Sequence, residues 1–262
     1  MDKLKVDLHN HTSLCNHATG SMEEYIKEAI KKGIDVFGFS CHNPMCFDAQ
    51  YRMRFEELPF YLGEILRLKE KYHGEIEILS ALEIDFLPPF MDEYLFTLPL
   101  DYRIGAVHFL GDWGFDNPEF IREYSKRDIN ECWVEYFKAT EMLAQSGKFD
   151  ILAHMDLLKV FKHYPTKDLR KEIESALKAV KQANMCVELN AAGFRKEVGE
   201  QYPSKTILQM AYALEIPITF GSDAHAIPQI NFKRKELEQV AREVGYTKCA
   251  LYRQREREMV EF

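Results

Sequence analysis

The stretch Leu4-Lys5-Val6-Asp7-Leu8-His9-Asn10-His11-Thr12 decides how the rest of the chain is interpreted. Its first residues alternate apolar and polar side chains, which predicts a strand over 4–8. Because side chains two residues apart point to the same side of an extended chain, His9 and His11 can direct both imidazoles at one ion. A single His-x-His pair is common by chance. The interpretation as a metal site therefore depends on further histidines and acidic residues later in the chain.

Composition limits the possible classes of protein. The chain has 262 residues, of which 46% are hydrophobic, and no break in composition divides it, so we expect a single domain over 1–262. The formal charge of -8 argues against nucleic acid as a partner. Six cysteines without CxxC spacing, and the start Met1-Asp2-Lys3 without an apolar signal segment, predict a reduced, cytoplasmic protein. No apolar run approaches the ~20 residues that cross a bilayer, and nothing indicates an oligomeric state.

Strand and helix patterns alternate along the whole chain. The helix patterns begin with signals such as the capping sequence Ser21-Met-Glu-Glu24 and end near glycines such as Gly33. The predicted strands cover 4–8, 35–40, 75–82, 102–107, 151–153, 185–189 and 217–220, and the predicted helices cover 22–32, 59–72, 128–146, 169–182, 206–214 and 235–243. This alternation predicts a parallel α/β sheet, and at this length a closed or nearly closed barrel is favoured. Seven strands make it a distorted, TIM-like (β/α)7 barrel.

Histidines and acidic residues follow these strands at corresponding places. A lone histidine after a strand is more often a surface residue, and we assign His73 and His163 to helix-end and surface positions. In a parallel barrel, however, all carboxyl ends of the strands open on one face, where residues distant in sequence converge. The residues expected in this cluster are His9, His11, His17, His42, Glu83, His108, His154, Asp223 and His225.

Nine nitrogen and oxygen donors exceed the needs of one ion and suit two or three divalent ions, with Zn, Mn or Fe favoured. Cys15 and Cys41 are interpreted as packing residues. Metal pairs with a bridging carboxylate serve hydrolysis, because they lower the pKa of a shared water and polarise the electrophile. An amidohydrolase barrel would share much of this pattern. The additional donors His17, His42 and His225 favour a third ion and therefore a phosphate substrate over an amide.

The ligand set resembles that of the polymerase and histidinol phosphatase (PHP) superfamily over nearly the whole chain. Several further segments are similar to its histidinol-phosphate phosphatase branch. These segments are Phe47-Asp48, Tyr51-Arg52-Met53, Glu57-Leu58-Pro59, Arg103-Ile104-Gly105-Ala106-Val107-His108-Phe109, Trp113-Gly114-Phe115-Asp116 and His154-Met155-Asp156-Leu157.

This resemblance implies a distorted seven-stranded barrel with three metals at its carboxyl face and hydrolysis of L-histidinol phosphate, a phosphate monoester, in histidine biosynthesis. It implies one metal on His9, His11, Glu83 and Asp223, a second shared through Glu83 with His108 and His154, and a third on His17, His42 and His225. Glu83, Asp223, His225 and Arg195 are the expected catalytic residues. In one departure, Ser40-Cys41-His42 stands where many members carry Thr-Asp-His, so an outer carboxylate expected near the third metal is absent.

Substrate contacts are less clearly marked than ligands. Arg195 follows the sixth strand, in the region where the family places a phosphate-binding arginine, and Lys159 is a second candidate that a surface position on a helix would equally explain. The loop 43–57, with Tyr51 and Arg52, is long enough to form a lid over the site. Three alternatives remain open: a phosphodiesterase or nuclease of the superfamily, a protein-tyrosine phosphatase of the superfamily, and a binding protein without catalysis.

Overall fold

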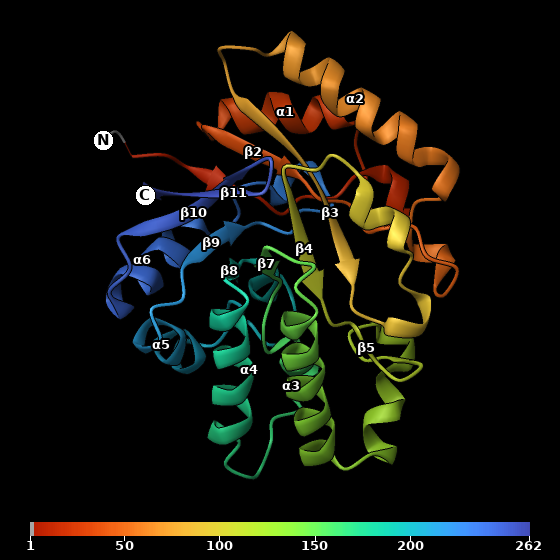
Figure 1. Cartoon of the computed structure of the whole chain (residues 1–262), viewed down its shortest axis with the longest axis vertical. Helices are drawn as coiled ribbons and strands as arrows, with labels where there is room; N and C mark the ends of the chain where they lie inside the picture. Colours follow the sequence, from red (N-terminus) through yellow and green to blue (C-terminus); the bar gives the residue numbers. More distant parts are fainter. Residues whose placement is uncertain (1–2) are drawn as a thin grey trace.

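Seven parallel strands form one sheet in the computed structural model, which describes residues 3–262 (Figure 1). The order in the sheet is β1-β2-β3-β4-β7-β8-β9, so each of these strands pairs with the one that precedes or follows it along the chain. The strands are β1 (Val6–Asp7), β2 (Val36–Phe39), β3 (Glu77–Asp85), β4 (Tyr102–Ala106), β7 (Ile151–Leu152), β8 (Cys186–Asn190) and β9 (Ile218–Gly221). All seven predicted strands are confirmed, with ends that differ by a few residues.

The first and last strands come together just beyond their carboxyl ends. The amide of Leu8 donates to the carbonyl of Phe220 at 2.9 Å, and the amide of Asp223 donates to the carbonyl of His9 at 2.7 Å. Asn10 and Ala224 form an isolated parallel bridge between the same two segments. The sheet is therefore a nearly closed barrel, as predicted.

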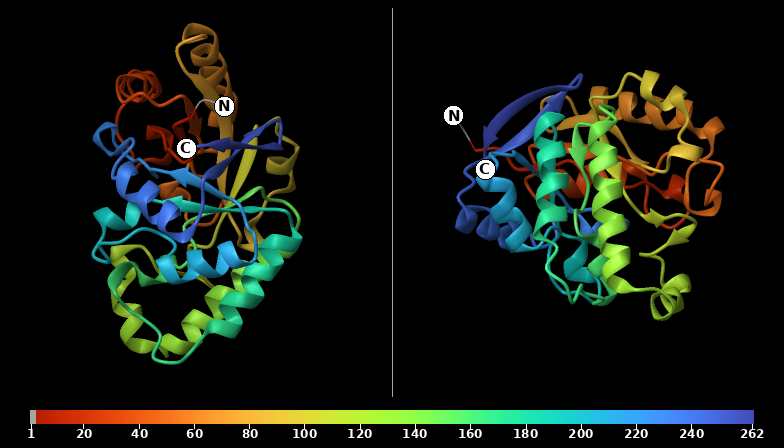
Figure 2. Two further views of the ribbon diagram at one scale, coloured as in Figure 1. Left: turned by 90° about the vertical axis from the view of Figure 1, so that its left-hand side faces the viewer. Right: turned by 60° about the horizontal axis from the view of Figure 1, so that its bottom comes forward.

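Within residues 3–262, six α-helices pack around the barrel, each in the place that the sequence predicted (Figure 2). Ser21 and Glu24 form the expected capping box, and Asp128 caps the third helix by accepting from the amides of Asn130 and Glu131. The helices are α1 (Met22–Lys31), α2 (Leu58–Lys71), α3 (Ile129–Gln145), α4 (Arg170–Gln182), α5 (Lys205–Ala213) and α6 (Arg234–Val244). None of the helices within residues 3–262 is long and apolar enough to cross a membrane. The prediction made from the start of the sequence falls partly on Met1 and Asp2, which lie outside the described residues.

A hairpin that the sequence analysis did not predict follows α6. Its strands, β10 (Lys248–Arg253) and β11 (Glu256–Glu261), are joined by Gln254 and Arg255, whose φ angles are 51° and 66°. A two-residue turn of this kind is usually signalled by Asn-Gly or Asp-Gly, and this turn has neither. A second, shorter hairpin, β5 (Phe109–Leu110) with β6 (Trp113–Gly114), follows β4.

The C-terminal hairpin covers the amino end of the barrel. Arg253 pairs with Glu77 at the start of β3, and Arg255 pairs with Asp150 immediately before β7. The amide of Leu4 donates to the carbonyl of Glu261, so the segment before β1 lies beside the last strand, β11 (Figure 1). Apolar residues of the hairpin join the buried cluster that fills the barrel interior. The amino end is thus filled and covered, and the carboxyl end is left for a site.

Candidate metal centre

All nine predicted ligands gather at the carboxyl end of the barrel. Eight lie in the loops that follow strands, and Glu83 lies within β3 itself, which continues to Asp85 instead of ending at residue 82 as predicted. The strand is longer because β4 continues to pair with it as far as Asp85 and Ala106. Two sets can be distinguished. We call Glu83, Asp223, His9, His11, His108 and His154 the Glu83 group, and we call His17, His42 and His225 the His225 group.

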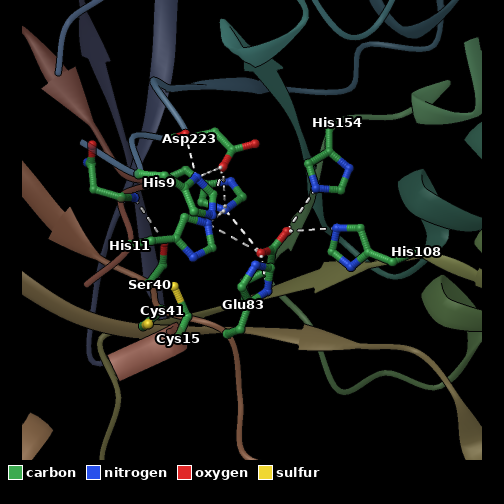
Figure 3. A network of polar contacts seen from close by, with 12 residues as sticks. His9, His11, Cys15, Ser40, Cys41, Glu83, His108, His154 and Asp223 are labelled. Carbon is green, nitrogen blue, oxygen red and sulfur yellow. Dashed lines mark hydrogen bonds and ion pairs between the residues drawn. The ribbon is translucent and has the colours of Figure 1, made fainter. Parts of the chain in front are cut away.

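Glu83 lies at the centre of the site, with a different histidine set on each carboxylate oxygen (Figure 3). Its Oε1 atom is 2.8 Å from Nε2 of His154 and 3.6 Å from Nε2 of His108. Its Oε2 atom is 3.4 Å from Nε2 of His9 and 3.5 Å from Nε2 of His11. A carboxylate placed in this way can be shared between two cations.

His9 and His11 direct their Nε2 atoms at the same point, as the strand geometry predicted. The two nitrogens lie 3.1 Å apart, and Oδ1 of Asp223 lies 3.2 Å from that of His11 and 3.9 Å from that of His9. Donor atoms bound to a tetrahedral ion with bonds of ~2.0 Å are about 3.3 Å apart. The spacing in this part of the Glu83 group is therefore that of a ligand set.

The His225 group is built from imidazoles alone. The ring centroids of His17 and His225 are 4.7 Å apart, and those of His17 and His42 are 5.2 Å apart. The Nδ1 atom of His17 donates to the carbonyl of Cys15, and that of His225 donates to the carbonyl of Asp223. These bonds leave Nε2 of both rings available as ligand atoms. The ring of His11 also lies close to this group, with its centroid 3.9 Å from that of His225 and 4.3 Å from that of His42. The assignment of a third metal to His17, His42 and His225 therefore stays a prediction.

Two outer carboxylates, Glu188 and Asp85, orient ligands of the Glu83 group and were not predicted. His9 donates from Nδ1 to Glu188 at 2.7 Å, and His108 donates from Nδ1 to Asp85 at 2.7 Å. Such bonds fix the tautomer and orientation of a metal-binding imidazole. The sequence could have indicated both residues. Glu188 is a carboxylate inside an apolar strand, and Asp85 lies two residues after Glu83, on the same side of β3.

His11 has no such carboxylate. Its Nδ1 atom is buried and makes no hydrogen bond within residues 3–262, and a ring nitrogen of His11 lies within 4.8 Å of the sulfurs of both Cys15 and Cys41. Both cysteines are fully buried, as expected for packing residues. At position 41, where the resemblance led us to expect an outer carboxylate, the structure therefore has the sulfur of Cys41 close to this ligand.

The carboxylates of the site dominate the protonation of the Glu83 group in the absence of metal. Burial alone would lower the pKa of His9, but the nearby carboxylates, Glu188 first among them, raise it well above its ordinary value. Burial alone would also lower the pKa of His108, but Asp85 and Glu83 raise it to about 10. The pKa of Glu83 is held well below its ordinary value, because the surrounding imidazoles outweigh the effect of burial.

Two histidines of the His225 group have lowered pKa values, whereas those of His9 and His108 are raised. Burial, and then the charge of His11, lower the pKa of His42 to about 4. Burial, and then His11, also lower the pKa of His225 well below its ordinary value. These two imidazoles are therefore neutral near pH 7, which is the form that binds metal.

The donor set fits divalent metal ions. Nδ1 of His42 and Oε2 of Glu83 are 3.0 Å apart and buried, yet they form no hydrogen bond with each other or with another group in residues 3–262. Buried polar atoms normally have partners, and a cation between such atoms would provide one. Several overlapping sets of three donors can be drawn here, including His9, His11 and Glu83, and His11, His42 and His225. Imidazole and carboxylate donors together favour first-row ions.

A cavity of about 600 Å³ opens over the cluster. Tyr51, Arg52 and Arg195, three of the predicted substrate contacts, line it together with ligands of both groups. This volume is typical of a small-molecule site. The loop 43–57 forms one wall, and Phe47 in that loop stacks on Phe90 with ring centroids 4.7 Å apart.

The three basic candidates differ in how far they are already paired. The guanidinium of Arg195 donates from Nη2 to the carbonyl of Asp223 at 2.7 Å, while its Nη1 atom is buried without a partner in the described chain. The buried Arg52 pairs with Asp85 at 2.6 Å. Lys159 is not a surface lysine: it is only 2% exposed and contacts Asp156 and Glu200. Arg195 is thus the candidate with the most unused donor capacity.

The fold and site together define the protein as a distorted (β/α)7 barrel with a histidine and carboxylate metal centre at its carboxyl face. The model of the PHP domain family matches residues 7–192, and the chain belongs to this family.

Relatives with assigned names agree with this placement. A Deinococcus radiodurans protein named "probable histidinol-phosphatase" is 38% identical over 247 residues, covering 91% of this chain and 93% of the relative. The histidinol-phosphatase of Bacillus subtilis is 28% identical and is matched over 96% of its length, with 87% of this chain covered. The crystal structure of histidinol phosphate phosphatase from Lactococcus lactis, complexed with Zn, L-histidinol and phosphate, superposes with a TM-score of 0.79 at 22% identity, over 97% of this chain and 98% of that one. At that identity the superposition shows that the fold is shared.

Proposed function

We propose that this protein is a metal-dependent phosphomonoesterase that hydrolyses L-histidinol phosphate to L-histidinol and phosphate. The observation that supports the proposal is the convergence of nine predicted ligands at a cavity of small-molecule size, which seven of them line. The substrate is supported by the Deinococcus radiodurans relative, which is 38% identical over most of both chains. We further propose two to three divalent ions, with Zn, Mn or Fe favoured by the donor set.

In this mechanism the residues of the chain orient ligands and balance charge. When bound, the ions would supply Lewis acidity to water and to the phosphate. Glu83 contributes one negative charge that two cations can share, because its two oxygens face different histidines. Glu188 and Asp85 hold the Nδ1 protons of His9 and His108, so that the Nε2 lone pairs point into the site.

Arg195 completes the charge balance in this proposal. A dianionic phosphate carries only acceptors, and a guanidinium can meet two of its oxygens at once. The unpartnered Nη1 of Arg195, on the wall of the cavity, supports this role. Tyr51, Arg52 and Lys159 stay predicted substrate contacts of lower weight, because Arg52 and Lys159 already pair with carboxylates.

The test is phosphate release from histidinol phosphate, from a phosphotyrosine peptide and from a bis-aryl phosphodiester, measured side by side on protein with known metal content. We expect activity on histidinol phosphate to dominate and to be lost on chelation. Dominant activity on either of the other two compounds would replace the proposed substrate, and undiminished turnover of fully metal-free protein would overturn the metal-dependent mechanism.

A further inference from the structure

Tyr202 forms part of the cavity wall and is not among the predicted site residues. Its backbone pairs with the end of β8: the amide of Asn190 donates to the carbonyl of Tyr202 at 2.7 Å, and the amide of Tyr202 donates back to the carbonyl of Asn190 at 3.1 Å. The side chain is fully buried from solvent, yet it lines the same cavity as His154 and Arg195. Tyr202 is therefore held rigidly beside the metal centre.

The ring of Tyr202 is fixed on several sides. The ring of His154 meets it edge-on, with centroids 6.4 Å apart, and the ammonium of Lys159 lies 5.2 Å from its centroid. A Cβ atom at Gly193 would lie 3.0 Å from Cε2 and 3.1 Å from Cζ of the ring. The ring thus packs closely against Gly193, and because the carbonyl oxygen of Glu200 would lie even nearer to such a Cβ atom, only glycine fits at this position.

The hydroxyl of Tyr202 has no hydrogen-bond partner among the protein groups of residues 3–262. A buried tyrosine hydroxyl normally has one. An ordinary phenol is protonated near pH 7 and can donate a hydrogen bond. The same wall carries the unpartnered Nη1 of Arg195. Two unused donors beside a metal centre suit a ligand that offers only acceptors.

We propose that Tyr202 is a phosphate-binding residue, whose hydroxyl donates a hydrogen bond to a non-bridging oxygen of the substrate phosphate alongside Arg195. The inference rests on the proposed function in one respect, that the ligand carries a phosphate group. It does not depend on which alcohol is esterified to that phosphate.

The experiment compares Tyr202→Phe with Tyr25→Phe in metal-loaded protein. Tyr25 is a matched control, because it is also fully buried, its hydroxyl also has no partner in residues 3–262, and it does not line the cavity. The probe is inorganic phosphate, whose dissociation constant is measured by calorimetry at matched metal content. Tyr202→Phe is expected to weaken phosphate binding roughly 10- to 150-fold, the range for one hydrogen bond to a charged group, while Tyr25→Phe leaves it unchanged.

A second measurement separates contact with the phosphate from contact with the histidinol moiety. Because the phosphate is common to both substrates, Tyr202→Phe should lower kcat/KM by the same factor for histidinol phosphate and for p-nitrophenyl phosphate. A loss confined to histidinol phosphate would overturn the phosphate assignment. Unchanged phosphate affinity in a Tyr202→Phe variant that melts like wild type would also overturn it. Weakened phosphate binding in a protein that does not hydrolyse histidinol phosphate would support this inference while rejecting the proposed substrate.

Discussion

The Glu83 group and the His225 group both contribute residues to one cavity but differ in charge and burial. The Glu83 group contains two carboxylates, and two of its histidines are oriented by further carboxylates at 2.7 Å. The His225 group contains three imidazoles and no carboxylate, and His17 within it is exposed. Cations in the Glu83 group would therefore be partly neutralised by the protein itself. A cation in the His225 group would keep most of its charge, which suits a place where an anionic substrate must bind.

The largest effect expected from this comparison is that of Glu83→Gln. Removing a charge shared between two cations should lower kcat/KM on the order of 10³-fold or more, because several kcal/mol of charge stabilisation are lost. His17→Ala, in the His225 group, should cost much less. Steady-state kinetics with metal analysis of both variants checks this, and equal losses would mean that Glu83 does not bridge.

Arg195→Ala tests whether anion binding can be separated from metal binding. A charge-assisted contact of ~1.5 to 3 kcal/mol corresponds to roughly a 10- to 150-fold loss in kcat/KM for histidinol phosphate. Metal content should stay at the wild-type value, and Arg195→Lys should recover only part of the loss, since a point charge lacks the planar fork of the guanidinium. Wild-type kinetics in Arg195→Ala would leave this residue without a role in catalysis.

Loss of an outer carboxylate should weaken metal binding more than loss of the Cys41 sulfur near His11. Asp85→Asn and Glu188→Gln are each expected to weaken metal binding in the Glu83 group by ~10 to 100-fold, because His108 and His9 lose the partners that orient them. Cys41→Ser, the matched change beneath His11, should alter metal affinity only a few-fold. Competition with a chromophoric chelator measures all three. A larger loss in Cys41→Ser would show that the sulfur carries the role of the missing carboxylate.

The smallest effect concerns the pH dependence of stability in metal-free protein. The pKa of His108 is raised to about 10, so its contribution to stability is fully present below pH ~6.5 and is lost as the pH rises towards 10. The pKa of His42 is lowered to about 4, so it costs stability as the pH falls from ~6.5 towards 4.

Urea unfolding of His108→Asn and His42→Asn between pH 5 and pH 9 measures this contrast, with an upper limit of ~1.4 kcal/mol per pH unit for one proton. His108→Asn should be most destabilised relative to wild type at low pH. The free energy of unfolding of His42→Asn, relative to that of wild type, should be highest at low pH, because only the wild type must protonate His42 there. If the free energy of unfolding of the two variants changed with pH in the same way, the electrostatic difference between the two groups would be wrong.

Local sequence was enough to predict the parts of the site that depend on periodicity. A strand has a period of two residues, so His9 and His11 had to share one side, and they do. Alternating strand and helix patterns predicted the barrel, because parallel strands require crossovers and their carboxyl ends then share one face. The C-terminal hairpin was missed because its turn, Gln254-Arg255, adopts positive φ angles without the residues that usually signal them.

Tertiary structure alone decided which side chains meet across the barrel. Glu188 is 179 residues from the His9 ring that it orients, and no local pattern links them. The sequence equally allowed Lys159 to lie on a surface, whereas the fold buries it against Asp156 and Glu200. Tyr202 reaches the cavity only because its segment pairs with the end of β8. The predicted ligand set could thus be drawn from the sequence, since strand ends converge in any parallel barrel. Their outer partners were decided by packing, since contacts between distant segments depend on how the closed barrel brings those segments together.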